Sequence, residues 1–167
     1  MLHSNVSFCD AMCVNSSEKA GIDVDLVPHG LEANAVKSVV TDLMQEAAQS
    51  LVQLVGAKAY KLNHIAGRGT ADSRPFQIFE GSNDILYVQI AEALLKQMKI
   101  AKEKNLFRYL NSFDLTHRAS GLIKELVEFD LETSLTQRKM ADLGKVVSRI
   151  VAMDLVLKLG EKGFDKE

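Results

Sequence analysis

The 167-residue sequence predicts an all-α fold, most simply a helical bundle. Apolar residues recur at three- and four-residue spacing over several long segments, which is the pattern of a helix with one buried face. No segment shows the alternation of apolar and polar residues that is typical of a half-buried strand. Hydrophobic side chains make up 47% of the chain, so it can bury the core of one compact domain or of two small helical lobes.

Residues 1–30 are predicted to form a short helical or irregular segment. Its two cysteines, Cys9 and Cys13, stand at positions i and i+4 and would share one face of a helix. A zinc site would need about two more ligands, and His3 is the nearest candidate. Two reduced thiols in an intracellular compartment are therefore the favoured interpretation, and no metal site is expected.

The first long helix is predicted to run from Leu31 to about Val52, on the period of its apolar residues. Pro28 and Gly30 mark its beginning, and Gly56 marks its end. The turn residues that follow, as far as position 75, indicate a loop with at most a short helix inside it.

A second long helix is predicted to begin at Ser82 and to continue as far as Met98. Its apolar surface is too wide for a helix at the protein surface, so this helix should be central. A short helical turn is expected from Leu106 to Leu110. The segments from Thr116 to Leu135 and from Thr136 to Leu159 are predicted to form a pair of antiparallel helices. Apolar residues of the first, such as Leu122 and Leu126, would pack against those of the second, such as Val146.

Glu80 is the most informative charged residue, because Ile78 and Phe79 precede it and Gly81 follows it at once. If those apolar side chains surround it, the carboxylate is poorly solvated and accepts protons better near neutral pH. The alternative is a solvated glutamate in a loop before a helix. Gly81 would let a ligand approach the backbone closely.

The residues after Gly81 have the properties of a helix N-terminus. Ser82 can accept a hydrogen bond from an amide of the first turn, and Asp84 suits the positive end of the helix dipole. Glu80 is therefore predicted to lie immediately before the N-terminus of the second long helix.

Residues 76–86, Phe-Gln-Ile-Phe-Glu-Gly-Ser-Asn-Asp-Ile-Leu, resemble the segment that carries the catalytic glutamate of acyl-CoA dehydrogenases. The resemblance is strongest to the very-long-chain type. A second segment, residues 52–60 (Val-Gln-Leu-Val-Gly-Ala-Lys-Ala-Tyr), is similar to the family's flavin loop, Gln-x-x-Gly-Gly-x-Gly-Tyr/Phe. The two segments keep the family's spacing, and the resemblance extends from about Ala33 to Leu95.

The sequence departs from the family pattern at several positions. Ala57 and Ala59 replace the second and third glycines of the flavin loop, which leaves the backbone less open to a ligand. Ala71 stands where the family has the arginine of an Arg-Asp pair, before Asp72, and Ser82 replaces a threonine.

The resemblance implies an FAD-dependent dehydrogenation of fatty acyl-CoA to trans-2-enoyl-CoA, a step of fatty acid β-oxidation. Glu80 would be the catalytic base, and the backbone of Gly81 would face the substrate. The residues that would contact FAD are Gln53, Leu54, Val55, Gly56, Ala57, Ser82, Asn83 and Asp84. The implied partners are acyl-CoA, an electron-transfer flavoprotein and further copies of the chain in a homodimer or homotetramer.

Three parts of the chain follow from this interpretation: residues 1–30, a domain like the C-terminal domain of the family at 31–113, and a C-terminal helical extension at 114–167. A complete member of the family also has an N-terminal helical domain and a β-domain, so this chain on its own is expected to be inactive. The alternative is a non-catalytic helical module, derived from that family, that mediates dimerisation or another interaction.

Charge and hydropathy exclude other classes of protein. The formal net charge is −2 and the isoelectric point is about 6.1, so no basic surface for nucleic acid or anionic lipid is expected. No apolar run approaches the roughly 20 residues of a membrane-spanning helix. A cytoplasmic or mitochondrial matrix protein fits this composition.

Overall fold

The computed structural model describes residues 2–19, 29–61, 63–132 and 134–163. Within these residues the fold is all-α, as predicted, and a single isolated β-bridge joins Asn105 to Asp130. The elements follow in the order α1 (Leu2–Lys19), α2 (Gly30–Val55), η2 (Gly56–Tyr60), α3 (Ile65–Ser73), η3 (Arg74–Gln77), α4 (Asn83–Ala101), α5 (Leu106–Ser112), α6 (His117–Ser120), η4 (Gly121–Ile123), α7 (Lys124–Val127) and α8 (Gln137–Glu161).

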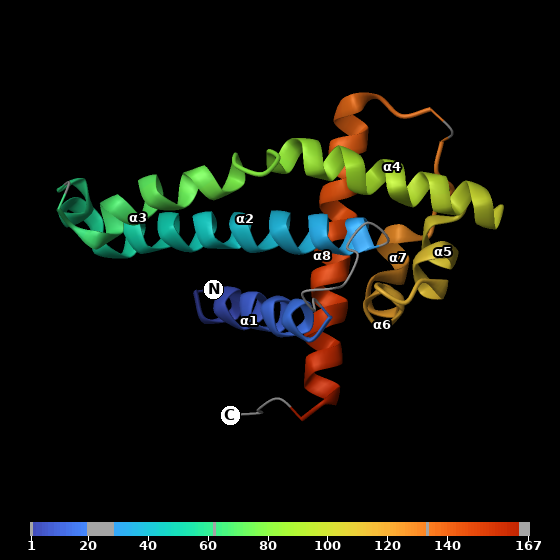
Figure 1. Cartoon of the computed structure of the whole chain (residues 1–167), viewed down its shortest axis with the longest axis horizontal. Coiled ribbons are helices and arrows are strands. Elements are labelled where there is room, and N and C mark those ends of the chain that lie inside the picture. The colour runs from blue at the N-terminus through green and yellow to red at the C-terminus, as the bar shows by residue number, and fades with distance from the viewer. Residues whose placement is uncertain (1, 20–28, 62, 133, 164–167) are drawn as a thin grey trace.

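The centre of the molecule is the crossing of α4 and α8, with α2 packed against both helices (Figure 1). Gly144 makes this close approach possible, because a Cβ atom there would lie 1.8 Å from the carbonyl oxygen of Tyr87 on α4. Ile90 and Leu94 of α4 and Val147 and Val151 of α8 are fully buried. The prediction that the helix after Ser82 is central is therefore confirmed.

Helix α2 confirms the first predicted long helix. It begins at Gly30 and ends at Val55, where Gly56 takes a φ of 67° that an L-residue rarely adopts. Pro28, the other residue expected to mark its beginning, lies outside the described residues. The loop predicted after Gly56 contains the short helix α3, as expected.

The C-terminal half of α2, with η2, α3 and η3 packed beside it, forms a two-layered extension that we call the arm (residues 46–77). Figure 1 shows the arm projecting away from α1 and α8. At Gly67 a Cβ atom would lie 2.2 Å from the carbonyl oxygen of Ala59, so α3 lies directly against η2. Within the arm, helix α3 therefore packs on α2, η2 and η3.

The prediction of one helix from Thr116 to Leu135 is wrong. The chain forms α6, η4 and α7 instead, and residues 128–136 contain no helix among those described. Leu106 N–H donates to the Phe129 carbonyl at 2.9 Å, and Leu131 N–H donates to the Lys104 carbonyl at 3.0 Å. These backbone bonds to a distant segment need extended chain, which a continuous helix cannot supply. Leu122 and Leu126, expected to be buried, are 70% and 75% exposed.

The last predicted helix is confirmed as α8, which begins after the N-cap Thr136. The prediction that it packs on a helix from Thr116 to Leu135 is wrong, because α8 packs mainly on α4 and α2, and on α1 and α6 to a lesser extent. Val146, expected in that interface, is 47% exposed. Asp154 of α8 is buried and accepts hydrogen bonds from the N–H groups of Arg118 and Ala119 at 2.7 and 3.1 Å. It therefore caps α6 from a helix that is distant in the sequence.

Candidate functional site

Glu80 lies in a tight turn between η3 and α4, two residues before the N-cap Ser82. Two successive residues of this turn have left-handed backbone angles, with φ of 57° at Glu80 and 96° at Gly81. Glycine adopts such angles freely, whereas a glutamate is strained there by about 1–2 kcal/mol. Backbone strain of this kind persists only where the surrounding structure imposes it, so contacts from neighbouring elements must hold the turn in this conformation.

The Glu80 side chain is exposed, and its neighbours Ile78 and Phe79 are 51% and 67% exposed. The expectation of a poorly solvated carboxylate is therefore wrong for this chain alone, and the alternative of a solvated residue before a helix describes it better. The reason is that the apolar side chains beside Glu80 face solvent, and no described element covers them.

The N-terminus of α4 agrees in part with the capping predicted from the sequence. Ser82 takes the N-cap position and Asp84 lies in the first turn, as predicted. The Ser82 hydroxyl makes no capping hydrogen bond, contrary to expectation, although its carbonyl accepts from the N–H of Leu86 at 3.0 Å. Both Ser82 and Asp84 reach the surface.

Asn83 is buried and its side-chain amide bonds to α2. Its Nδ2 donates to Oδ1 of Asp42 at 2.7 Å, to Oγ1 of Thr41 at 2.9 Å and to the carbonyl of Ser38 at 3.1 Å. Its Oδ1 accepts from the ammonium of Lys37 at 2.9 Å. Because these bonds use its hydrogen-bonding groups, the Asn83 side chain is a structural anchor for the start of α4.

Asp42 is the centre of this network. Its Oδ1 also accepts from Nε2 of Gln77 at 2.7 Å, and its Oδ2 accepts from the hydroxyl of Tyr87 at 2.6 Å. Arg149 of α8 forms an ion pair with Asp42 at 3.7 Å and a closer one with Glu46 at 3.0 Å. One buried carboxylate thus connects α2, η3, α4 and α8 directly behind the Glu80 turn.

Sequence reasoning missed Lys37, Asp42, Tyr87 and Arg149. The available signal was Asp42 itself, a carboxylate that interrupts the apolar face of a predicted buried helix. A buried charge of that kind requires partners, but its partners come from three elements that are distant in the sequence. Their identity depends on the tertiary structure.

The predicted flavin segment, residues 53–57, lies at the outer end of the arm. At about 1.5 Å per residue, Gln53 is about 18 Å further along α2 than Thr41, which contacts Asn83. Gln53, Leu54, Gly56 and Ala57 are exposed, and Val55 is half-buried. The structure therefore does not bring the two groups of predicted cofactor residues together within one chain.

An open groove of about 560 Å³ lies between α4 and α8, close to the Glu80 turn. It is lined by Asp84, Ile85, Val88, Gln89, Glu92, Gln137, Arg138 and Ala141. This volume is in the range of small-molecule sites. Its walls combine apolar side chains with charges of both signs.

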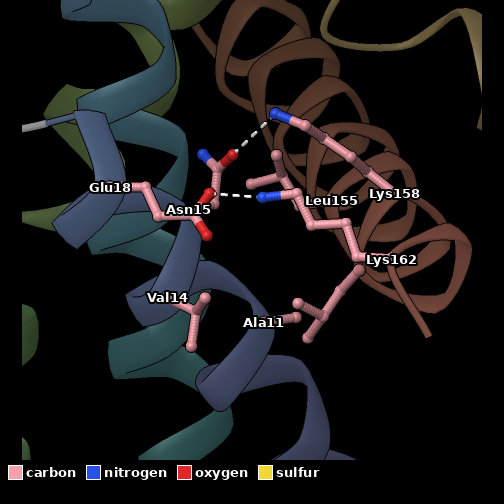
Figure 2. Close-up of a pocket in the computed structure, with 8 residues that line it drawn as sticks. Ala11, Val14, Asn15, Glu18, Leu155, Lys158 and Lys162 are labelled. Atoms are coloured by element: carbon pink, nitrogen blue, oxygen red, sulfur yellow. Dashed lines mark hydrogen bonds and ion pairs between the residues drawn. The ribbon is translucent and has the colours of Figure 1, made fainter. Parts of the chain in front are cut away.

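A second cavity, between α1 and α8, is excluded as a substrate site by its size. Its volume is about 10 Å³, which is room for about one water molecule. Figure 2 shows that its polar walls are already paired, since Lys158 donates to Oδ1 of Asn15 at 3.1 Å and Lys162 bonds to Glu18. Asn15 in turn donates to Oε1 of Glu32 at 2.7 Å. This cavity belongs to the packing of α1.

Two further observations concern ligands and membranes. Cys9 and Cys13 are both free thiols on α1, and the described residues contain no group of three or more metal-ligating side chains arranged to hold an ion. None of the described helices has the length and apolar character needed to cross a membrane.

Comparison with known families identifies the domain. The model of the acyl-CoA dehydrogenase C-terminal domain matches residues 13–95, which include both the 53–57 segment and the Glu80 turn. Residues 13–95 of the chain belong to the acyl-CoA dehydrogenase family. No curated protein and no solved structure matched the chain. In this acyl-CoA dehydrogenase domain, the match covers α2, α3 and most of α4, whereas α5 to α8 lie beyond it.

Proposed function

We propose that the chain is the C-terminal helical domain of an FAD-dependent dehydrogenase that oxidises fatty acyl-CoA to trans-2-enoyl-CoA, with Glu80 as catalytic base. One observation carries the proposal. The Glu80 carboxylate is presented to solvent from a strained turn, and Asn83 and Asp42 behind that turn are buried and bonded to each other. A strained backbone that the surrounding structure holds in place is typical of active sites.

The backbone of the turn suits the proposed chemistry. Among the described residues, the N–H of Glu80 makes no hydrogen bond, so it is free to donate to the carbonyl of a thioester. That donation would stabilise the enolate-like charge that forms when Glu80 removes the α-proton. The backbone of Gly81 would face the same substrate. FAD bound beside the substrate would accept the β-hydride.

The exposed segment 53–57 is the proposed second contact with the cofactor. Gln53 has an exposed amide side chain, and Gly56 has no side chain to cover its left-handed backbone, whose N–H bonds to the carbonyl of Val52. Because Gln53 lies about 18 Å further along α2 than Thr41, which contacts the first residue of α4, this segment would contact FAD of another subunit in a homodimer or homotetramer. Ser82 and Asp84 would contact FAD from the start of α4, whereas the Asn83 side chain is already bonded inside the domain.

The chain alone is proposed to be inactive. Proton abstraction from a thioester needs a site that excludes water, and the Glu80 side chain is exposed with Ile78 and Phe79 beside it. Further domains would cover these apolar residues. Electrons would pass from reduced flavin to an electron-transfer flavoprotein, in the cytoplasm or the mitochondrial matrix.

A flavin titration of the purified chain tests the cofactor site. Wild type, Gln53→Ala and Gln49→Ala are compared by the absorbance and fluorescence of added FAD. Gln49 is the matched control, because it is an exposed glutamine one turn earlier on α2. We expect saturable binding that Gln53→Ala weakens by about tenfold or more, the loss of one good hydrogen bond to the cofactor. Equal binding by both variants would contradict the proposed contact.

An acyl-CoA oxidation assay with an artificial electron acceptor tests the catalytic role. We expect no turnover from the chain alone. Turnover abolished by Glu80→Gln would confirm the base and overturn the proposed inactivity, whereas turnover that survives Glu80→Gln would reject Glu80 as the base.

A non-catalytic dimerisation module is the second candidate. It is favoured by exposed apolar side chains on and beside the arm, among them Leu54 at 74%, Ile65 at 75% and Phe79 at 67%. Large apolar side chains that face solvent in this number are typical of an interaction surface. Sedimentation equilibrium of the flavin-free chain separates the two candidates, because a stable dimer with no flavin affinity would support the module alone.

A further inference from the structure

We propose that Lys37 is a positioning residue for Glu80. The ammonium group of Lys37 holds the left-handed turn, because it bonds the backbone of the turn and the first residue of α4 at the same time. The inference takes from the proposed function only that Glu80 is the reacting group. Lys37 lies outside both of the sequence segments that resemble the family's catalytic and flavin motifs.

The geometry of Lys37 carries the inference. Its Nζ donates to the carbonyl oxygen of Gly81 at 2.8 Å and to Oδ1 of Asn83 at 2.9 Å. These two acceptors flank Ser82, so one cation connects the strained turn to the first residue of α4. A charge-assisted hydrogen bond to a carbonyl is stronger than a neutral one, which suits a contact that opposes backbone strain.

The surroundings explain why the ammonium stays in this place. Asn83 is fixed by Ser38, Thr41 and Asp42, so one of the two acceptors of Lys37 is itself immobile. Lys37 is half-buried on α2, and its stem leaves that helix one turn before Thr41. The ammonium is therefore held between a rigid helix and the turn that carries Glu80.

Lys37 also interacts with Glu80 through charge. Burial lowers the pKa of Lys37 below the usual lysine value, and the carboxylates of Glu80 and Asp42 act in the opposite direction. The ammonium therefore lies within electrostatic range of Glu80 as well as bonding its turn. The titration of Lys37 therefore reports how close its ammonium lies to Glu80.

The first test measures the rigidity of the turn. The peptide plane between Gly81 and Ser82 contains the carbonyl that Lys37 holds, and the N–H of Ser82 reports its motion by ¹⁵N relaxation. We expect an order parameter of about 0.85 in wild type and below about 0.6 in Lys37→Met. Lys37→Arg, which keeps the charge, should retain part of the rigidity.

The matched control is Lys96→Met. Lys96 is exposed on α4 and has no bond to the turn, so this variant should leave the order parameter of Ser82 unchanged. An order parameter that stays near about 0.85 in Lys37→Met would overturn the proposal. This readout needs neither flavin nor substrate, so it is independent of the outcome of the function tests.

The second test keeps Lys37 and removes the charge of Glu80, which also covers the case that Lys37→Met fails to fold. The titration of the Lys37 side chain is followed by NMR at its Cε in wild type and in Glu80→Gln. Glu80 is exposed, so this variant should fold normally. We expect a lower pKa for Lys37 in Glu80→Gln, because the attraction that raises it is lost. An unchanged pKa would show that the ammonium does not lie close to Glu80, and would reject its role in holding the turn that carries this residue.

Discussion

At the scale of single residues, Asp42 shows how a charge can be placed in the apolar face of a helix. Both of its oxygens are occupied, by the amides of Gln77 and Asn83 on one side and by Tyr87 and Arg149 on the other. A buried carboxylate is costly without partners, and with them it fixes the elements that supply those partners. The position of the Glu80 turn is therefore a consequence of a residue on another helix.

Tyr87 gives this network a dependence on pH. Burial, followed by the hydrogen bond to Asp42, raises the pKa of Tyr87 well above the usual tyrosine value. The unfolded chain releases the tyrosine proton at about pH 10, whereas the folded protein retains it. The stability that this group contributes is thus complete below about pH 10 and is lost as the pH rises further.

We expect Tyr87→Phe to remove this part of the alkaline loss of stability, which amounts to about 1.4 kcal/mol per pH unit above pH ~10. Urea denaturation of wild type and Tyr87→Phe between about pH 8 and pH 11.5 measures the difference. Tyr60→Phe is the matched control, because Tyr60 is 91% exposed. Parallel pH profiles for wild type and Tyr87→Phe would contradict the assignment.

At the scale of elements, the contact between α4 and α8 is closer than most helix pairs allow. It is possible because Gly144 has no Cβ where the backbone of Tyr87 passes. The same contact brings Arg149, further along α8, to Asp42 on α2. Helix α8 therefore supports the network behind Glu80, although it lies beyond the residues that match the family.

We expect Gly144→Ala to destabilise the protein by at least about 3 kcal/mol, because the added methyl group collides with backbone that cannot move aside. Gly160→Ala is the control on the same helix, since a Cβ there meets nothing within 4 Å. That variant should stabilise the protein by up to about 1 kcal/mol through helix propensity. Urea denaturation of both variants measures the two effects, and similar free energies of unfolding would disprove the close crossing.

At the scale of the whole molecule, the arm is packed against fewer long helices than the crossing of α4 with α8. Helix α3 contacts α2, η2 and η3, whereas α4 packs against both α2 and α8 (Figure 1). Local opening is easier where fewer buried contacts must be broken. The arm also carries the proposed flavin segment, so its mobility bears on function.

We expect native-state hydrogen exchange to show a lower free energy of opening in α3 than in α4. Amides of Arg68 to Ser73 should exchange at least about tenfold faster than those of Ile90 to Leu94, which corresponds to about 1.4 kcal/mol. Saturating FAD should slow exchange in the arm if the flavin contact exists. Equal protection of the two helices in the free chain would show that the arm is as stable as the core.

The sequence by itself determined the helical class, the extents of α2, α4 and α8, and the family. Each of these depends on local signals: apolar periodicity, the glycine at position 56, and the two motif segments. Such signals are contained within about 10 to 25 consecutive residues, and helix formation is a local process.

The tertiary structure decided what those elements contact. It broke the helix predicted from Thr116 to Leu135, because the backbone of Phe129 and Leu131 bonds to residues 104–106. It exposed Glu80, and it supplied Lys37 and Asp42 as the support of its turn. Hydrogen bonds between distant segments have no local pattern, since each needs a donor and an acceptor that only the folded chain brings together.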